Sequence, residues 1–419
     1  MAPSGTAAIR SIRDGTPTAA RPCSASMLPP LPARKLALAA ALSLVMGVVH
    51  GVVAGPAGAA HAVARLIDRV GKTPYDRYET IDSLGRTITF FLAQAVKPTP
   101  AANTPATDNT TPPSGTESQA SRDAVAATPG APTTATTPEP IRVPLVVFIQ
   151  GSGAGSHFIK VGDKTGVTTG FPYIHDALKG RGRVLVVDKP GVEFFSQPEQ
   201  PGSAEGASDA FRREHTLDRW AEAVRASIDA ALALPGVDAS RLMVMGHSEG
   251  GLVACRIAAI EPRVTHVAIL AGGGPSQLFD FAHMARHGGM FDIVSSNPDE
   301  RIRWLDDAWK GVLADPDSPD KMWLGHPHRR WSTFCATSPI EQLLKCDPKV
   351  RVYVAQGTFD QAVAPITAEV LDAELRGRGR DVTLNLIEGG DHGFFTQPER
   401  PGTGMQGVFG ACVEWFLKP

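Results

Sequence analysis

Short apolar runs alternate with amphipathic stretches over the last two thirds of the chain. β-branched runs predict strands buried on both faces, and 3.6-residue periodicity predicts the helices between them. The predicted strands are 143–150, 183–188, 241–245, 264–270, 350–355 and 382–387, and the predicted helices are 171–179, 217–234, 252–260, 365–375 and 406–417. This order predicts an α/β fold with a mostly parallel, doubly wound sheet and helices on both faces.

Two segments precede this alternation. Residues 63–96 contain two alternating runs, 78–83 and 86–92, around Leu84-Gly85, which predict a β-hairpin at the antiparallel edge of the sheet. Residues 97–140 are rich in Pro, Thr and Ala and hold no aromatic side chain, Ile, Leu or Met. Such a tract buries too little apolar surface to order itself, so we expect a disordered linker.

The first 62 residues read as a pre-sequence. Arg34 and Lys35 precede an apolar run over 36–55, and Ala60-His61-Ala62 has the small-x-small pattern of a cleavage site. This order predicts a secretory signal peptide, with translation starting at Met27, and an exported periplasmic or secreted protein. The alternative is an uncleaved anchor over 36–55, the one way in which the chain would meet a membrane.

Residues 275–347 break the alternation and hold four of the six tryptophans. We expect a helical cap inserted between two parts of the α/β core, 141–274 and 348–419. Most of its aromatic side chains would pack the cap, and a few would line the substrate site. Export permits disulfides, and Cys335 and Cys346 close the short loop that we expect to be bridged.

Composition removes several classes of function. A net charge of −2 gives no field that would attract nucleic acid, so no nucleic-acid partner is expected. Five cysteines without a C-x-x-C pair provide no metal-binding spacing. We therefore expect a small-molecule substrate, no metal and no cofactor. The oligomeric state stays open.

The strongest chemical signal follows the strand 241–245. It runs into Gly246-His247-Ser248-Glu249-Gly250 and then into an apolar helix. A serine in this G-x-S-x-G context lies on a tight strand-to-helix turn that the glycines permit, at a helix N-terminus that stabilises negative charge. Ser248 is the candidate nucleophile.

A nucleophilic serine needs a base, and the base needs an orienting acid. Asp360 follows the strand 350–355, and His392 follows the last predicted strand, so both lie where sites in open α/β sheets gather. We expect Asp360 as the acid and His392 as the base. Asp391 is a rival acid, although a residue adjacent to His392 generally points away from the ring, and Glu388 is a weaker rival.

An oxyanion hole needs two N–H donors. One is expected at Glu249, the residue after the nucleophile, and the other in the glycine-rich loop 151–155, where we choose Ser152. No G-x-x-x-x-G-K-[ST] pattern supports the alternative of a phosphate-binding loop.

These motifs resemble the α/β-hydrolase superfamily over about residues 143–419, most closely its secreted bacterial esterase and serine-aminopeptidase-like branch with a cap. The resemblance implies Ser248 as nucleophile, His392 as base and Asp360 as acid. Gln150 stands where many members have His before the oxyanion glycine, and Lys189-Pro190-Gly191 replaces a common Arg-Gly pattern. The first departure puts the hydrogen bonding of that loop in doubt, and the second is expected to matter little.

The leading hypothesis is a serine hydrolase that cleaves carboxylic esters through an acyl-enzyme. An amide or peptide hydrolase and an acyltransferase stay open on the same triad, as does an inactive binding protein with this fold. An aminopeptidase would need acids to bind the substrate amine. Four candidates are Glu249, Asp306, Asp307 and Glu341, and nothing in the sequence separates them.

Overall fold

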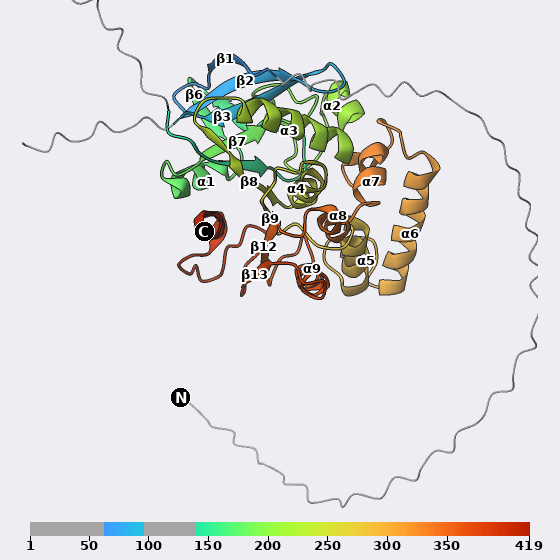
Figure 1. Cartoon of the computed structure of the whole chain (residues 1–419). Coiled ribbons are helices and arrows are strands. Elements are labelled where there is room, and N and C mark those ends of the chain that lie inside the picture. Colours follow the sequence, from blue (N-terminus) through green and yellow to red (C-terminus); the bar gives the residue numbers. More distant parts are fainter. Residues whose placement is uncertain (1–62, 96–139) are drawn as a thin grey trace, which may run out of the picture. The chain divides into compact units, whose positions relative to one another are not determined.

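The computed structural model describes residues 63–95 and 140–419. Their main element is a nine-stranded sheet in the order β1-β2-β3-β7-β4-β8-β9-β12-β13, which Figure 1 shows from the blue edge strands to the red β13. The strands are β1 Arg65–Arg69, β2 Tyr75–Ile81, β3 Thr87–Ala93, β4 Val143–Ile149, β7 Arg183–Val187, β8 Val237–His247, β9 His266–Leu270, β12 Arg351–Gly357 and β13 Val382–Ile387. The first three pair antiparallel, β3 meets β7 antiparallel, and the strands from β7 to β13 are parallel.

Helices cover both faces of the sheet because its strands are apolar on both sides. On one face α3 (Leu217–Leu232), α4 (Glu249–Ile260) and α9 (Ile366–Arg376) pack on alternate residues such as Leu145 and Val147. On the other face α1 (Phe171–Leu178) and α10 (Gly404–Leu417) pack on the intervening residues such as Val146 and Phe148 (Figure 1). The predicted doubly wound α/β fold is confirmed.

Between β9 and β12 the chain forms a run of helices interrupted by two very short strands. These are α5 Gln277–His287, the 3₁₀ helix η1 Met290–Ile293, α6 Pro298–Ala314, the two-residue strands β10 Met322–Trp323 and β11 His326–Pro327, α7 His328–Phe334 and α8 Pro339–Lys345. Phe281, Phe291, Leu305 and Trp331 form a small core of their own with Trp304, Trp309 and Trp323 packed against it. We call residues 275–347 the cap.

The sequence analysis missed four elements outside the cap. β1 adds a third strand to the predicted hairpin, and β5 (Phe158–Val161) pairs with β6 (Lys164–Val167) as a small separate hairpin. The short helix α2 (Asp209–Glu214) is capped by Ser208, whose hydroxyl accepts from the N–H of Phe211. β1 carries mostly exposed side chains and β6 carries no buried one, so neither has an apolar period that could have revealed it.

The expected disulfide is wrong. Cys255, Cys335, Cys346 and Cys412 are all free and buried. Cys335 ends α7 inside the cap core, whereas Cys346 follows α8 and joins the core of the sheet. Helix α8 therefore separates two cysteines that are close along the chain.

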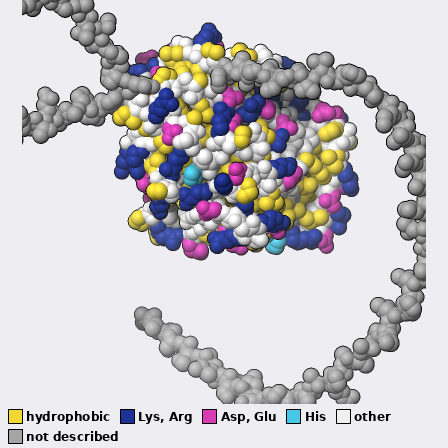
Figure 2. Space-filling model, viewed as in Figure 1, with side chains coloured by type: hydrophobic (Ala, Val, Ile, Leu, Met, Phe, Trp, Pro, Cys, Tyr) yellow, Lys and Arg dark blue, Asp and Glu magenta, His cyan; other side chains and the backbone are white. Residues whose placement is uncertain are grey.

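The signal peptide, the start at Met27, the anchor over 36–55 and nearly all of the linker 97–140 lie outside the described residues. Over residues 63–95 and 140–419, no helix combines the length and hydropathy of a membrane span. Figure 2 shows Lys and Arg side chains intermingled with Asp and Glu over the face in view.

Candidate active site

Ser248 occupies a strained turn between β8 and α4. Its backbone has φ 57°, a left-handed conformation that non-glycine residues rarely adopt, and its N–H donates to the carbonyl of Leu270 at 2.8 Å. A Cβ on Gly246 would lie 1.9 Å from the Gly250 carbonyl oxygen, and one on Gly250 would lie 2.4 Å from that of Ile149. The flanking glycines are therefore sterically required, and the strain falls on Ser248.

His392 and Asp360 meet across 32 residues of sequence. The Nδ1 of His392 lies 2.9 Å from Oδ2 of Asp360, which follows β12 and is buried. The other carboxylate oxygen accepts from the N–H groups of Ala362 and Val363, at 2.8 and 3.0 Å. Burial would raise the pKa of Asp360, but the hydrogen bond and charge of His392 and these N–H groups outweigh it and lower that pKa.

The rival acids lie elsewhere. Asp391 is exposed, and its Oδ1 accepts from the N–H groups of Gly393 and Phe395, both at 2.9 Å, so its carboxylate closes the turn that carries His392. Glu388 is also exposed. Only Asp360 of the three makes a contact with the His392 ring among the described residues.

One cavity of about 340 Å³ brings the other candidate residues together. Ser248, His392, Ser152 and Glu249 all line it, and the cap closes it with Phe281 and other side chains. Within the described residues, neither the N–H of Ser152 nor that of Glu249 has a hydrogen-bond acceptor. Both N–H groups are therefore free to donate to a bound molecule.

The glycine-rich loop 151–155 is held in place by Lys189. Its Nζ donates to the carbonyls of Gly151 and Gly153, both at 2.7 Å, and lies 4.3 Å above the ring of Trp220. These two bonds fix the backbone on either side of Ser152. The sequence analysis gave the Lys189 departure little weight, whereas its ammonium group contacts the glycine-rich loop directly. Gln150, the other departure, donates from Nε2 to the carbonyl of Gly155 at 3.0 Å.

The side chain of Glu249 lies in a buried cluster of charges. It forms an ion pair with Arg330 of α7, and its Oε1 lies 3.7 Å from Lys189 Nζ and 3.6 Å from His215 Nε2. Burial would raise the pKa of Glu249, but the two cations outweigh it and hold that pKa well below its usual value. Burial lowers the pKa of Lys189 to about 8 and that of His215 to about 4.

The site thus combines a serine on a strand-to-helix turn, a histidine held by a carboxylate and a glycine-rich loop. A comparison with protein families gives the following match. Residues 146–401 match the model described as the alpha/beta hydrolase family. The chain belongs to the alpha/beta hydrolase family. No curated protein matches this hydrolase-family chain.

Solved structures that match this chain do so at low sequence identity. Est1E from Butyrivibrio proteoclasticus is 15% identical, with 82% of this chain and 98% of that chain covered and a TM-score of 0.43. Acetyl xylan esterase 1 from a Thermoanaerobacterium species is 13% identical, with 85% and 88% covered and a TM-score of 0.47. An acylaminoacyl peptidase from Pyrococcus horikoshii is 12% identical, with 82% of this chain and 41% of that chain covered and a TM-score of 0.46.

Of the four acids considered for amine binding, only Glu249 lines the cavity. Glu249 is occupied by its cations, while Asp306, Asp307 and Glu341 are exposed and do not line the cavity. The sequence analysis missed Asp280 of α5, which is buried and does line it. A lone Asp inside an amphipathic cap helix gave no signal that it lines the cavity of Ser248.

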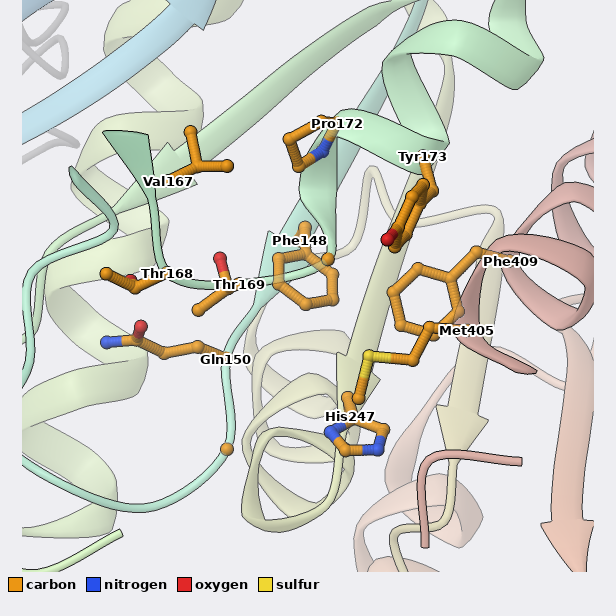
Figure 3. Close-up of a pocket in the computed structure, with 12 residues that line it drawn as sticks. Phe148, Gln150, Val167, Thr168, Thr169, Pro172, Tyr173, His247, Met405 and Phe409 are labelled. Atoms are coloured by element: carbon orange, nitrogen blue, oxygen red, sulfur yellow. The ribbon is translucent and has the colours of Figure 1, made fainter. Parts of the chain in front are cut away.

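A second cavity of about 440 Å³ is lined by Gly151 and His247, the residues that precede Ser152 and Ser248. Figure 3 shows its largely apolar wall, with Phe148, Tyr173, Met405 and Phe409 around it and His247 at one end. Burial and the charge of His392 lower the pKa of His247 to about 4. The neutral ring lies with Nε2 3.0 Å from the backbone oxygen of His392 and so supports the loop that carries it.

Proposed function

We propose that this chain is a serine hydrolase that cleaves carboxylic esters through an acyl-enzyme. The observation that carries the proposal is that Ser248, on its strained turn, shares one cavity with His392, whose Nδ1 is bonded to the buried Asp360. A triad is recognised by such geometry and by the roles it allows.

In acylation, Ser248 Oγ attacks the ester carbonyl carbon while His392 accepts the hydroxyl proton. Asp360 holds the ring with Nδ1–H toward itself, which leaves Nε2 as the base and stabilises the imidazolium that forms. The carbonyl oxygen becomes an oxyanion that accepts hydrogen bonds from the N–H groups of Ser152 and Glu249. Collapse breaks the carbon–oxygen bond, and His392 gives its proton to the leaving alcohol.

In deacylation, water replaces the alcohol. His392 takes a proton from the water, whose oxygen attacks the acyl carbon, and the acid leaves as Ser248 regains its proton. The turn at Ser248 contributes the dipole of α4 behind the oxyanion. Lys189 acts as a positioning residue, because it fixes the carbonyls on either side of the Ser152 N–H. We also propose that the protein is exported by the segment 27–62, whose residues lie outside the structure described.

The deciding experiment compares p-nitrophenyl esters from acetate to palmitate with aminoacyl p-nitroanilides, alongside a fluorophosphonate probe. Ester turnover and labelling that disappear in Ser248→Ala support the proposal. Anilide turnover above ester turnover would replace it with a peptidase. Absence of turnover and of labelling, in a chain that melts cooperatively, would identify an inactive member of the family.

A further inference from the structure

The cavity that holds Ser248 and His392 contains two carboxylates from outside the triad, and only one has a counter-ion. Glu249 pairs with Arg330 and lies beside Lys189. Arg330 itself packs its guanidinium over the rings of Trp331 and Phe334, 3.7 and 4.5 Å from their centroids. These groups are engaged with one another before any substrate enters.

Asp280 is the unpaired carboxylate. It lies on α5 with 6% of its surface exposed, and it lines the cavity. Its Oδ1 accepts one hydrogen bond, from the N–H of Ala364 at 3.3 Å, while Oδ2 has no donor and neither oxygen has a cation within 4 Å among the described residues. The bond to Ala364 ties the cap to the loop that follows Asp360, but a neutral oxygen would serve that purpose equally well.

A buried carboxylate without a cation is costly. Burial, and then the charge of Asp360, raise the pKa of Asp280 to about 7. Lys189 and Arg330 supply two positive charges near the site, against three negative charges on Glu249, Asp280 and Asp360. When Asp280 is ionised, these charges leave one excess negative charge, which one monovalent cation would neutralise.

We infer that Asp280 binds an organic ammonium group of the substrate, so that the reaction acts on esters or amides that carry an amine close to the bond cleaved. This inference rests on the proposed function and names its substrate class. Phe281, Met290 and Trp331 line the same cavity and give it apolar and aromatic surface that suits the carbon skeleton around an alkylammonium.

Three ethyl esters that differ at one substituent test the charge directly. Leucine ethyl ester carries an ammonium on the α-carbon, ethyl 4-methylpentanoate carries hydrogen, and monoethyl isobutylmalonate carries a carboxylate. At pH 7.2, where an α-amino group is largely protonated, we expect kcat/KM for the ammonium ester to exceed that for the neutral ester by about tenfold or more. In a second pair, acetylcholine carries a cation on the alcohol half of the ester, and 3,3-dimethylbutyl acetate is its uncharged analogue. Comparison of the two pairs shows whether the enzyme recognises a cation on the acyl half or on the alcohol half.

Asp280→Asn is the decisive variant, because its amide oxygen keeps an acceptor for the Ala364 N–H and removes only the charge. The ratio of kcat/KM for the ammonium ester to kcat/KM for the neutral ester should fall by about tenfold or more. Asp307→Asn is the matched control, since Asp307 is exposed on α6 and pairs with Lys310. A wild-type enzyme that shows no cation preference in either pair, or that prefers the malonate half-ester through Arg330, overturns the inference without needing any variant.

Binding separates this inference from the proposed function. Leucinol, which has the amine but no ester, should raise the Tm of wild type and Ser248→Ala, and should leave that of Asp280→Asn unchanged. Leucinol binding without hydrolysis of any ester or fluorophosphonate labelling would keep the ammonium site and overturn the proposed hydrolase. Hydrolysis of neutral esters without leucinol binding or a cation preference would keep the hydrolase and overturn the ammonium site.

Discussion

The Nδ1 of His392 lies 2.9 Å from Oδ2 of Asp360, and this oxygen also accepts from Nε2 of Gln356 at 2.8 Å. With both oxygens of the carboxylate bonded, Asp360 presents one acceptor to His392 in a fixed direction. It thereby selects the tautomer in which Nε2 is the base.

Asp360→Asn should therefore lower kcat by about 10³- to 10⁴-fold, because an amide at this position can donate to Nδ1 and turn the ring into the wrong tautomer. Steady-state kinetics on a p-nitrophenyl ester provide the measurement. Asp391→Asn is the control and should stay within about threefold of wild type, since that carboxylate contacts only N–H groups of its own turn. A larger loss in Asp391→Asn than in Asp360→Asn would transfer the acid role to Asp391.

Lys189→Met should lower kcat by about 10- to 100-fold and change KM little. The side chain holds Gly151 and Gly153, and the Ser152 N–H between them matters most once the oxyanion forms. Lys164→Met, on the exposed strand β6, is the control. The rate of fluorophosphonate labelling, measured on folded protein, should fall with kcat. A lower Tm with unchanged kcat would show that Lys189 only stabilises the fold.

The four described cysteines should behave as free, unreactive thiols. Burial raises the pKa of Cys335 to about 12 and that of Cys346 to about 11, so little thiolate forms near neutral pH. In a chain that starts at residue 63, a disulfide reagent at pH 8 should react with none of the four thiols in the native state and with all four after unfolding. Two thiols after unfolding without reductant would demonstrate a disulfide.

The candidate triad could be found from sequence because each member follows a strand with a clear apolar run. Ser248, Asp360 and His392 come after β8, β12 and β13, and neighbouring parallel strands end at the same edge of the sheet. Lys189 also follows a strand, β7, but its role depends on two backbone carbonyls and one aromatic ring that no residue pattern places together.

The cap could be located by its aromatic content, but its contribution to the site could not be predicted. Asp280 and Arg330 are 50 residues apart, and they enter the same cavity only through the packing of α5 and α7 around Trp331 and Phe281. The wrong disulfide has the same origin. Spacing along the chain did not reveal that α8 would carry Cys346 away from Cys335.

Asp280 also predicts a pH dependence of stability that is independent of catalysis. Its pKa is about 7 in the folded chain against an ordinary 3.8, so between these values the folded state holds a proton that the unfolded state has released. Stability from this group therefore falls as the pH rises from about 4 to 7, by roughly 4 kcal/mol at most, and the loss is complete above pH 7.

Asp280→Asn removes this loss, because its amide never ionises. In urea unfolding at 25 °C, the variant and wild type should differ little at pH 4, and the variant should be the more stable of the two at pH 8. Other groups with shifted pKa values, such as the buried Asp188, cancel in the comparison because both chains contain them. An equal difference at pH 4 and pH 8 would show that the carboxylate ionises in the folded chain as readily as in the unfolded one. If Asp280→Asn gains stability at pH 8 and loses its preference for ammonium esters, then the same buried charge destabilises the fold and recognises the substrate.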